Sequence, residues 1–157
     1  MTDAAAVFVA RYGGLFEHSP WVVERAALRL PFADLHDGLM QVVHDAPQEE
    51  QLALIRAHPE LAGKAAIDGT LTDASTSEQA SAGLQRLSPE EYERFHDLNR
   101  RYRERFGFPF IICVRLTDKA GILAAMQERL ANERSTEINN ALVQIGEITR
   151  LRLEDIL

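Results

Sequence analysis

Side chains able to move protons or bind a polar molecule gather between residues 58 and 79. His58 opens this stretch beside Pro59, and Ser75, Glu78 and Gln79 close it. Imidazole, hydroxyl, carboxyl and amide groups can transfer a proton or hydrogen-bond a polar ligand. The apolar periodicity typical of amphipathic helices lapses in the glycine-containing part between them. We therefore interpret residues 58–79 as one half of an active site.

The setting of His58 distinguishes it from the other histidines. A proline biases the residue before it away from helical geometry, so Pro59 should end a helix at His58 and leave the imidazole at the helix terminus. A lone histidine is more often structural than catalytic, and no role is assigned to the remaining four, which are His18, His36, His44 and His96. On local pattern alone, both interpretations of His58 stay open.

Ser75 and Glu78 also have a purely structural explanation. Their S-x-x-E spacing is that of a capping box, in which the serine begins a helix and the glutamate bonds back to it. The two explanations are compatible, because a helix N-terminus offers free N–H groups to a polar ligand. We expect this helix to run from Ser75 to about Leu87.

An arginine falls on the inward face of the last predicted helix. The residues on this face recur every three or four positions; they are Ile138, Leu142, Ile145, Thr149, Arg152 and Ile156. A buried guanidinium needs an anionic partner. Arg152 could instead extend to the surface, pair with a buried carboxylate, or await an anionic substrate.

Motifs for a metal or a common cofactor are missing from the sequence. It contains no H-x-x-x-H, cysteine pair, P-loop, G-x-S-x-G or dinucleotide fingerprint. The single cysteine, Cys113, lies in an apolar run, so we expect a buried and unreactive thiol. We therefore predict no metal site and no cofactor.

The composition indicates a small globular protein. Of the 157 residues, 46% are apolar, which suffices for one packed core and for a single domain over 1–157. The net charge of -7 argues against broad binding to nucleic acid or anionic lipid. One cysteine suits a reducing compartment, and neither a signal peptide nor a membrane span is evident. We expect a cytoplasmic protein.

Helical patterns cover most of the chain, so we predict an all-α fold of about seven to nine helices. Ser19 and Ser88 each precede a proline and are predicted N-caps. The run FPFIICV, residues 108–114, is the one strand-like segment and is expected to be buried and extended. The predicted helices cover 3–12, 20–30, 33–45, 47–58, 75–87, 89–106, 117–130 and 135 to near the C-terminus, with a loop or broken helix over 59–72.

Several motifs together resemble those of the 2-oxo-4-hydroxy-4-carboxy-5-ureidoimidazoline (OHCU) decarboxylase family. They are SPWVVERA at 19–26, HPELAGK at 58–64, LTDASTSEQ at 71–79, GFPFIICV at 107–114 and LRL at 151–153. The resemblance covers nearly the whole chain. It implies an all-helical, commonly dimeric, cofactor-free lyase that converts OHCU to (S)-allantoin, the third step of urate oxidation in purine catabolism.

The resemblance also implies roles for particular residues. His58 matches the catalytic histidine and Glu78 a second catalytic residue. The implied substrate-binding residues are Pro59, Ser75, Gln79, the segment Phe110, Ile111, Ile112, Cys113 and Val114, and Arg152. Arg150 lies close enough to Arg152 that a shift of alignment would transfer the role of substrate anchor.

The family's reaction suits a site without a cofactor. The substrate carries a carboxylate and a hydroxyl on one ring carbon next to a C=N bond, which accepts the electrons released with carbon dioxide. Two rival functions stay open: another cofactor-independent lyase or isomerase acting on a small anionic heterocycle, and a non-catalytic helical module in which His58 and Glu78 cap helices.

Overall fold

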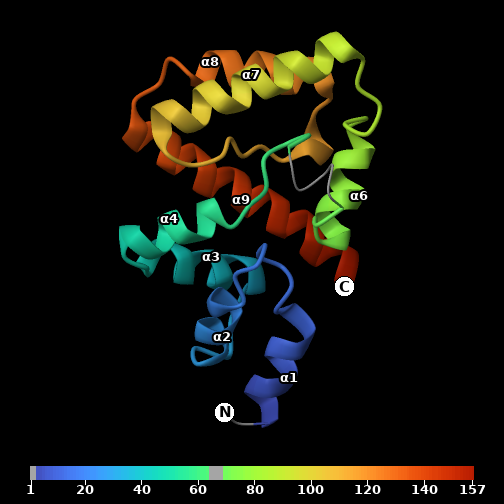
Figure 1. The fold of residues 1–157 in the computed structure, drawn as a ribbon. Coiled ribbons are helices and arrows are strands. Elements are labelled where there is room, and N and C mark those ends of the chain that lie inside the picture. Colours follow the sequence, from blue (N-terminus) through green and yellow to red (C-terminus); the bar gives the residue numbers. More distant parts are fainter. Residues whose placement is uncertain (1–2, 64–68) are drawn as a thin grey trace.

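The computed structural model describes residues 3–63 and 69–157, and within these residues it contains helices and no β-strand (Figure 1). The prediction of an all-α fold is confirmed. In chain order the helices are α1 (Asp3–Tyr12), α2 (Trp21–Ala27), α3 (Leu35–Asp45), α4 (Gln48–Arg56), α6 (Asp73–Ser81), α7 (Pro89–Phe106), the short 3-10 helix η1 (Val114–Leu116), α8 (Lys119–Arg129) and α9 (Arg134–Ile156).

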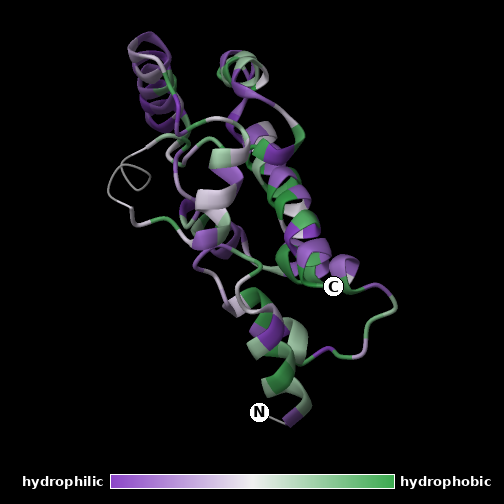
Figure 2. Ribbon diagram, turned by 90° about the vertical axis from the view of Figure 1, so that its right-hand side faces the viewer, coloured by the Kyte–Doolittle hydropathy of each residue, from purple (hydrophilic) through white to green (hydrophobic). Residues whose placement is uncertain are grey.

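The long C-terminal helix α9 runs through the middle of the molecule (Figure 1). Helices α3 and α4 pack on one side of it, and α7 and α8 lie together on the other side. Figure 2 shows hydrophobic and hydrophilic bands alternating along this helix, as expected for a helix with a buried stripe. The predicted stripe is confirmed except at Ile156, which is 41% exposed.

The start of α7 follows directly from its sequence. Ser88 accepts a hydrogen bond from the backbone N–H of Glu91, and the Glu91 carboxylate accepts one from the N–H of Ser88. This reciprocal pair is the predicted capping box. Gly107 ends the helix with a φ of 80°, a conformation that glycine adopts without strain. The buried residues of α7 are Phe95, Leu98, Asn99, Tyr102 and Phe106, whereas Tyr92 is 38% exposed.

Helix α6 begins one turn earlier than predicted. Its N-cap is Thr72, whose hydroxyl accepts from the N–H of Ser75, so the predicted capping box of Ser75 and Glu78 is wrong. The helix also ends at Ser81 rather than near Leu87, since Gly83 turns the chain with a φ of 79°. The shift places Ser75 and Glu78 inside the helix, which frees their side chains for other contacts.

Two smaller predictions also need correction. Ser19 does not cap α2, because its hydroxyl donates to the backbone oxygen of Glu17, and α2 ends at Ala27 rather than near residue 30. Of the predicted loop over 59–72, residues 64–68 lie outside the described part of the chain. The run 108–113 is extended and largely buried, as predicted, and it leads into η1.

Candidate active site

One cavity gathers all eleven residues that the sequence singled out. About 440 Å³ of space, counted out to its mouth, lies between α6, α9, the start of the 58–63 loop and the extended segment before η1. Its wall contains His58, Pro59, Ser75, Glu78, Gln79, Phe110, Ile111, Ile112, Cys113, Val114 and Arg152, together with Leu61, Arg115 and Ile148, which were not predicted. The wall combines mainly apolar side chains with a few polar groups, which is the usual composition of a small-molecule site.

His58 presents one unpaired nitrogen in this cavity wall. Its Nδ1 lies 2.9 Å from the backbone oxygen of Leu54 one turn earlier, and a carbonyl can only accept, so Nδ1 carries the proton. Nε2 is buried and has no hydrogen-bond partner within the described structure. Burial lowers the pKa of His58 to about 4, outweighing the opposing effects of the Leu54 hydrogen bond and Glu17. The ring is therefore neutral near pH 7, with a free lone pair on Nε2.

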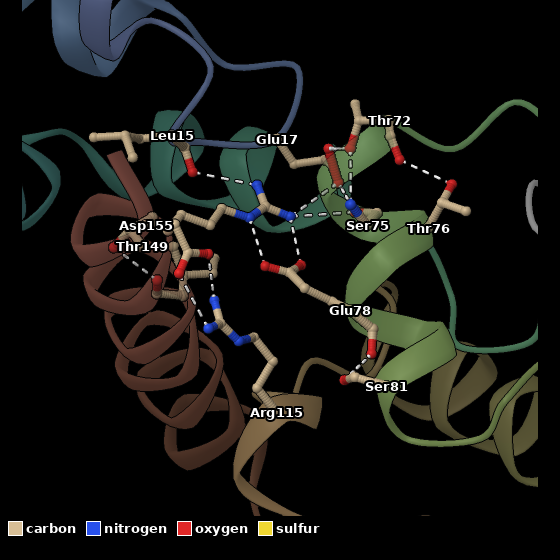
Figure 3. A network of polar contacts seen from close by, with 12 residues as sticks. Leu15, Glu17, Thr72, Ser75, Thr76, Glu78, Ser81, Arg115, Thr149 and Asp155 are labelled. Atoms are coloured by element: carbon tan, nitrogen blue, oxygen red, sulfur yellow. Dashed lines mark hydrogen bonds and ion pairs between the residues drawn. The ribbon is translucent and has the colours of Figure 1, made fainter. Parts of the chain in front are cut away.

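Arg152 pairs with Glu78 through two parallel hydrogen bonds. Nε and Nη2 of the guanidinium lie 2.9 and 2.8 Å from the two carboxylate oxygens (Figure 3). The Arg152 side chain is only 7% exposed, so the interpretation of Arg152 as a surface group is wrong, and pairing with a buried carboxylate is correct. Burial alone would lower the pKa of Arg152, but bonding to Glu78 raises it overall, so the guanidinium stays charged.

Arg150 takes a different position. It donates to Glu147 and Glu154 of its own helix, and 39% of its side chain is exposed. Two residues separated by two positions on a helix point in different directions. This explains why Arg152 reaches the cavity wall and Arg150 does not.

A second carboxylate, missed by the sequence analysis, lies behind this pair. Glu17 follows α1 in a turn, is 2% exposed, and accepts from the hydroxyls of Thr72 and Ser75 (Figure 3). Its Oε2 is 3.6 Å from Nη2 of Arg152. No periodicity marks Glu17 in the sequence; the available signal was an acidic residue directly after the apolar pair Leu15 and Phe16.

The amide of Gln79 has a fixed orientation. Its Oε1 accepts from the backbone N–H of Ala62 at 3.0 Å, which leaves the NH₂ group to donate. Ala62 itself has a φ of 51°, an uncommon value for a residue with a side chain. The loop after His58 and helix α6 are thereby tied together at the cavity, and the site gains a hydrogen-bond donor of known direction.

Side chains from α8 and α9 hold the extended segment in place. Arg129 donates to the backbone oxygen of Ile111 at 2.8 Å, and the Cys113 N–H donates to Oε1 of Gln144 at 2.9 Å. Arg129 also pairs with Glu137, which is fully buried. These contacts engage some backbone groups of the segment, so a ligand would have to bind through the others.

The Cys113 side chain fits the expectation of an unreactive thiol. It is free, buried and in the cavity wall, and burial raises its pKa. Over the described residues, no group of three or more histidine, cysteine, aspartate or glutamate side chains is arranged to hold a metal ion. Nor does any described helix have the length and hydropathy to cross a membrane.

The fold and site define a class: a helical protein whose pocket combines a neutral imidazole, a buried ion pair and amide donors for a small polar ligand. Residues 2–154 match the family model described as OHCU decarboxylase, so the chain belongs to the OHCU decarboxylase family. An OHCU decarboxylase from Haloferax volcanii is 45% identical over 151 residues, which cover 94% of this chain and 88% of the relative.

Two solved structures share the fold. The crystal structure of (S)-allantoin synthase superposes with a TM-score of 0.75 at 29% identity, over 98% of this chain and 50% of that chain. This chain thus spans half of that longer one. The crystal structure of an OHCU decarboxylase in the presence of (S)-allantoin has a TM-score of 0.69 at 22% identity, over 88% and 92% of the two chains. The predicted family and its fold are confirmed.

Proposed function

We propose that this chain catalyses the reaction of its family, the decarboxylation of OHCU to (S)-allantoin, in the cavity around His58. Membership of the family supports the reaction. The observation that supports the location is the neutral, buried His58, whose unpaired Nε2 shares one cavity wall with the Arg152–Glu78 pair.

The substrate's own structure determines what the protein must supply. When the bond between the ring carbon and its carboxylate breaks, carbon dioxide leaves and the electron pair moves toward the adjacent C=N bond, whose nitrogen takes a proton. An enol-like intermediate results. Loss of its hydroxyl proton and protonation of the neighbouring carbon then give allantoin. The protein has to orient the substrate, exclude water and deliver that proton to one face.

His58 is placed to exchange protons with the substrate hydroxyl. Because Nδ1–H is bonded to Leu54, Nε2 is the atom that accepts a proton and can return it. The low pKa keeps this atom unprotonated at neutral pH, as a base requires.

Arg152, Gln79 and the extended segment bind and orient the substrate in this proposal. The guanidinium binds an anionic or carbonyl group of the substrate, and its pairing with Glu78 keeps that carboxylate at the cavity wall for proton exchange. The Gln79 NH₂ donates to a carbonyl oxygen, and Ser75, Pro59 and the free backbone groups of 110–114 complete the contacts.

The test is the optical activity of the product. Urate is converted by an excess of the two upstream enzymes, and allantoin formation is followed by circular dichroism with wild type or His58→Ala. We expect fast formation of (S)-allantoin with wild type, and turnover about 10²–10⁴-fold lower with the variant, because one acid–base group is lost. The exposed His44→Ala serves as control. Wild-type traces identical to the uncatalysed course would refute the function.

The proposal extends to cofactor, assembly and location. Turnover should survive prolonged dialysis against a chelator, since the C=N bond accepts the electrons. We propose a homodimer, as the family resemblance implies, and light scattering at several concentrations tests it. We also propose a single domain over 1–157 and a cytoplasmic location. The free Cys113 is consistent with a cytoplasmic location, and cell fractionation tests the location.

A further inference from the structure

Glu17 is a buried charged residue beside the candidate site that the proposed mechanism does not use. Its carboxylate accepts two hydroxyl hydrogen bonds, one from the N-cap Thr72 and one from Ser75 inside α6. It also lies 3.6 Å from Nη2 of Arg152. Glu17 belongs to the turn after α1, so a single carboxylate connects the N-terminal turn with α6 and α9.

Glu17 is ionised in this setting. Burial alone would raise its pKa, but the hydrogen bonds from Ser75 and Thr72, together with the charge of Arg152, lower the pKa overall. An ionised carboxylate accepts hydrogen bonds only, so both hydroxyl protons point toward Glu17. The Ser75 oxygen is consequently free to accept from Nη2 of Arg152, which lies 3.3 Å away.

The guanidinium of Arg152 is thereby held from two directions. Glu78 binds its Nε and Nη2 on one side, while on the other side the turn after α1 supplies Glu17 and the backbone oxygen of Leu15, 3.3 Å from Nη1. Figure 3 shows these groups converging from the N-terminal turn and α6. Glu17 is not part of the cavity wall, whereas Ser75 and Arg152 are.

We propose that Glu17 is a positioning residue for the decarboxylation: it fixes Ser75 and Arg152 in the orientation in which they meet the substrate. This inference rests on the proposed function. It assigns Glu17 no contact with the substrate, and its effect passes through the Ser75 hydroxyl and the guanidinium.

A distinct kinetic signature follows from the charge. Glu17→Gln keeps the size of the side chain but removes a negative charge beside Arg152, so an anionic substrate meets less repulsion there. Its amide accepts through only one oxygen and holds the two hydroxyls less well. Looser placement of reacting groups lowers kcat, since a shift of about 1 Å can cost about 100-fold. We expect kcat to fall by about 10–100-fold while KM stays level or falls.

The experiment compares wild type, Glu17→Gln, Thr72→Val and Glu24→Gln in the circular dichroism assay of (S)-allantoin formation. Thr72→Val removes one hydrogen bond to Glu17, together with the N-cap of α6, at a residue outside the cavity wall. It should lower kcat several-fold without raising KM. Glu24 is exposed on α2, and its variant should match wild type. Far-ultraviolet spectra and melting curves confirm that each variant is folded.

Two results would overturn the inference: a folded Glu17→Gln with wild-type kcat, or a raised KM at unchanged kcat. If Glu17→Gln does not fold, Thr72→Val provides the test. A folded Thr72→Val with the same kcat as wild type would then refute the inference. The wild-type arm tests the function separately. If wild type shows no activity above the uncatalysed course, both the proposed function and this inference are refuted. If wild type is active and Glu17→Gln has the same kcat, only this inference is refuted.

Discussion

Among the residues that the structure describes, Glu17, Glu137 and Arg152 are buried charged residues, and each has fixed partners. Arg152 meets Glu78, Glu17 and two further oxygen acceptors, and Glu137 accepts from Tyr102, Arg129, Asn132 and Asn140. His58 avoids the cost of a buried charge by staying neutral. Such pairing is needed because an isolated buried charge costs several kcal/mol. Three buried side-chain atoms have no hydrogen-bond partner in the described structure: Nε2 of His58, Oδ1 of Asn99 and Nη2 of Arg129. Among these three residues only His58 belongs to the cavity wall, and its Nε2 is the atom expected to meet the substrate.

Arg152 and Arg150 provide a matched pair of substitutions. Arg152→Ala leaves the buried Glu17 and the partly buried Glu78 without their counter-charge, so we expect stability to fall by about 3–5 kcal/mol and turnover to be lost. Arg150→Ala removes a half-exposed side chain bonded to its own helix and should leave both nearly unchanged. Urea denaturation and the (S)-allantoin assay measure the two effects. If Arg150→Ala lost turnover and Arg152→Ala kept it, the role of substrate anchor would belong to Arg150.

Among the elements, α9 and α6 supply the ion pair, and the extended segment 108–113 closes the cavity between them. An extended segment without a strand partner needs other groups for its backbone. Here Arg129 from α8 and Gln144 from α9 provide them. The geometry of the segment therefore depends on side chains far away in the sequence.

Gln144→Ala tests whether that support matters for binding. The Cys113 N–H loses its acceptor, and the segment should shift at the cavity wall, at a stability cost of about 1 kcal/mol. We expect KM to rise several-fold with a smaller change in kcat, as measured by steady-state kinetics. Gln127→Ala, on the exposed side of α8, is the control. An unchanged KM would mean that the segment contributes little to substrate binding.

For the molecule as a whole, the buried His58 makes stability depend on pH. Its pKa is about 4 when folded and about 6.5 when unfolded, so the unfolded chain binds more protons between these values. Stability is therefore fully present above about pH 6.5 and falls as the pH drops toward 4, by up to about 3 kcal/mol. The lowered pKa values of Glu17 and Glu137 add further losses at still lower pH.

The pH effect can be isolated by substitution. In urea denaturation at pH 7.5, 5.5 and 4.5, wild type should lose more stability than His58→Asn, because the variant has no imidazole to titrate. The exposed His44→Asn should follow wild type. Equal pH slopes for wild type and His58→Asn would show that His58 does not titrate as described.

Local sequence was sufficient for much of the helical framework. The capping box of α7, the end of α4 before His58 and the inward position of Arg152 follow from side-chain chemistry and spacing within one or two turns. The resemblance of the motifs further identified the family and eleven of the fourteen residues that line the cavity. These features were predictable because neighbours in the sequence, or a whole set of family motifs, determine them.

Only the tertiary structure decided which partners the polar groups take. Thr72 rather than Ser75 caps α6, and Ser75 and Glu78 are then available to bond Glu17 and Arg152. Ser75 is 58 positions from Glu17 in the sequence, and Glu78 is 74 positions from Arg152. No local pattern encodes such a distant pairing, because it depends on how the helices pack and on which buried charges need compensation.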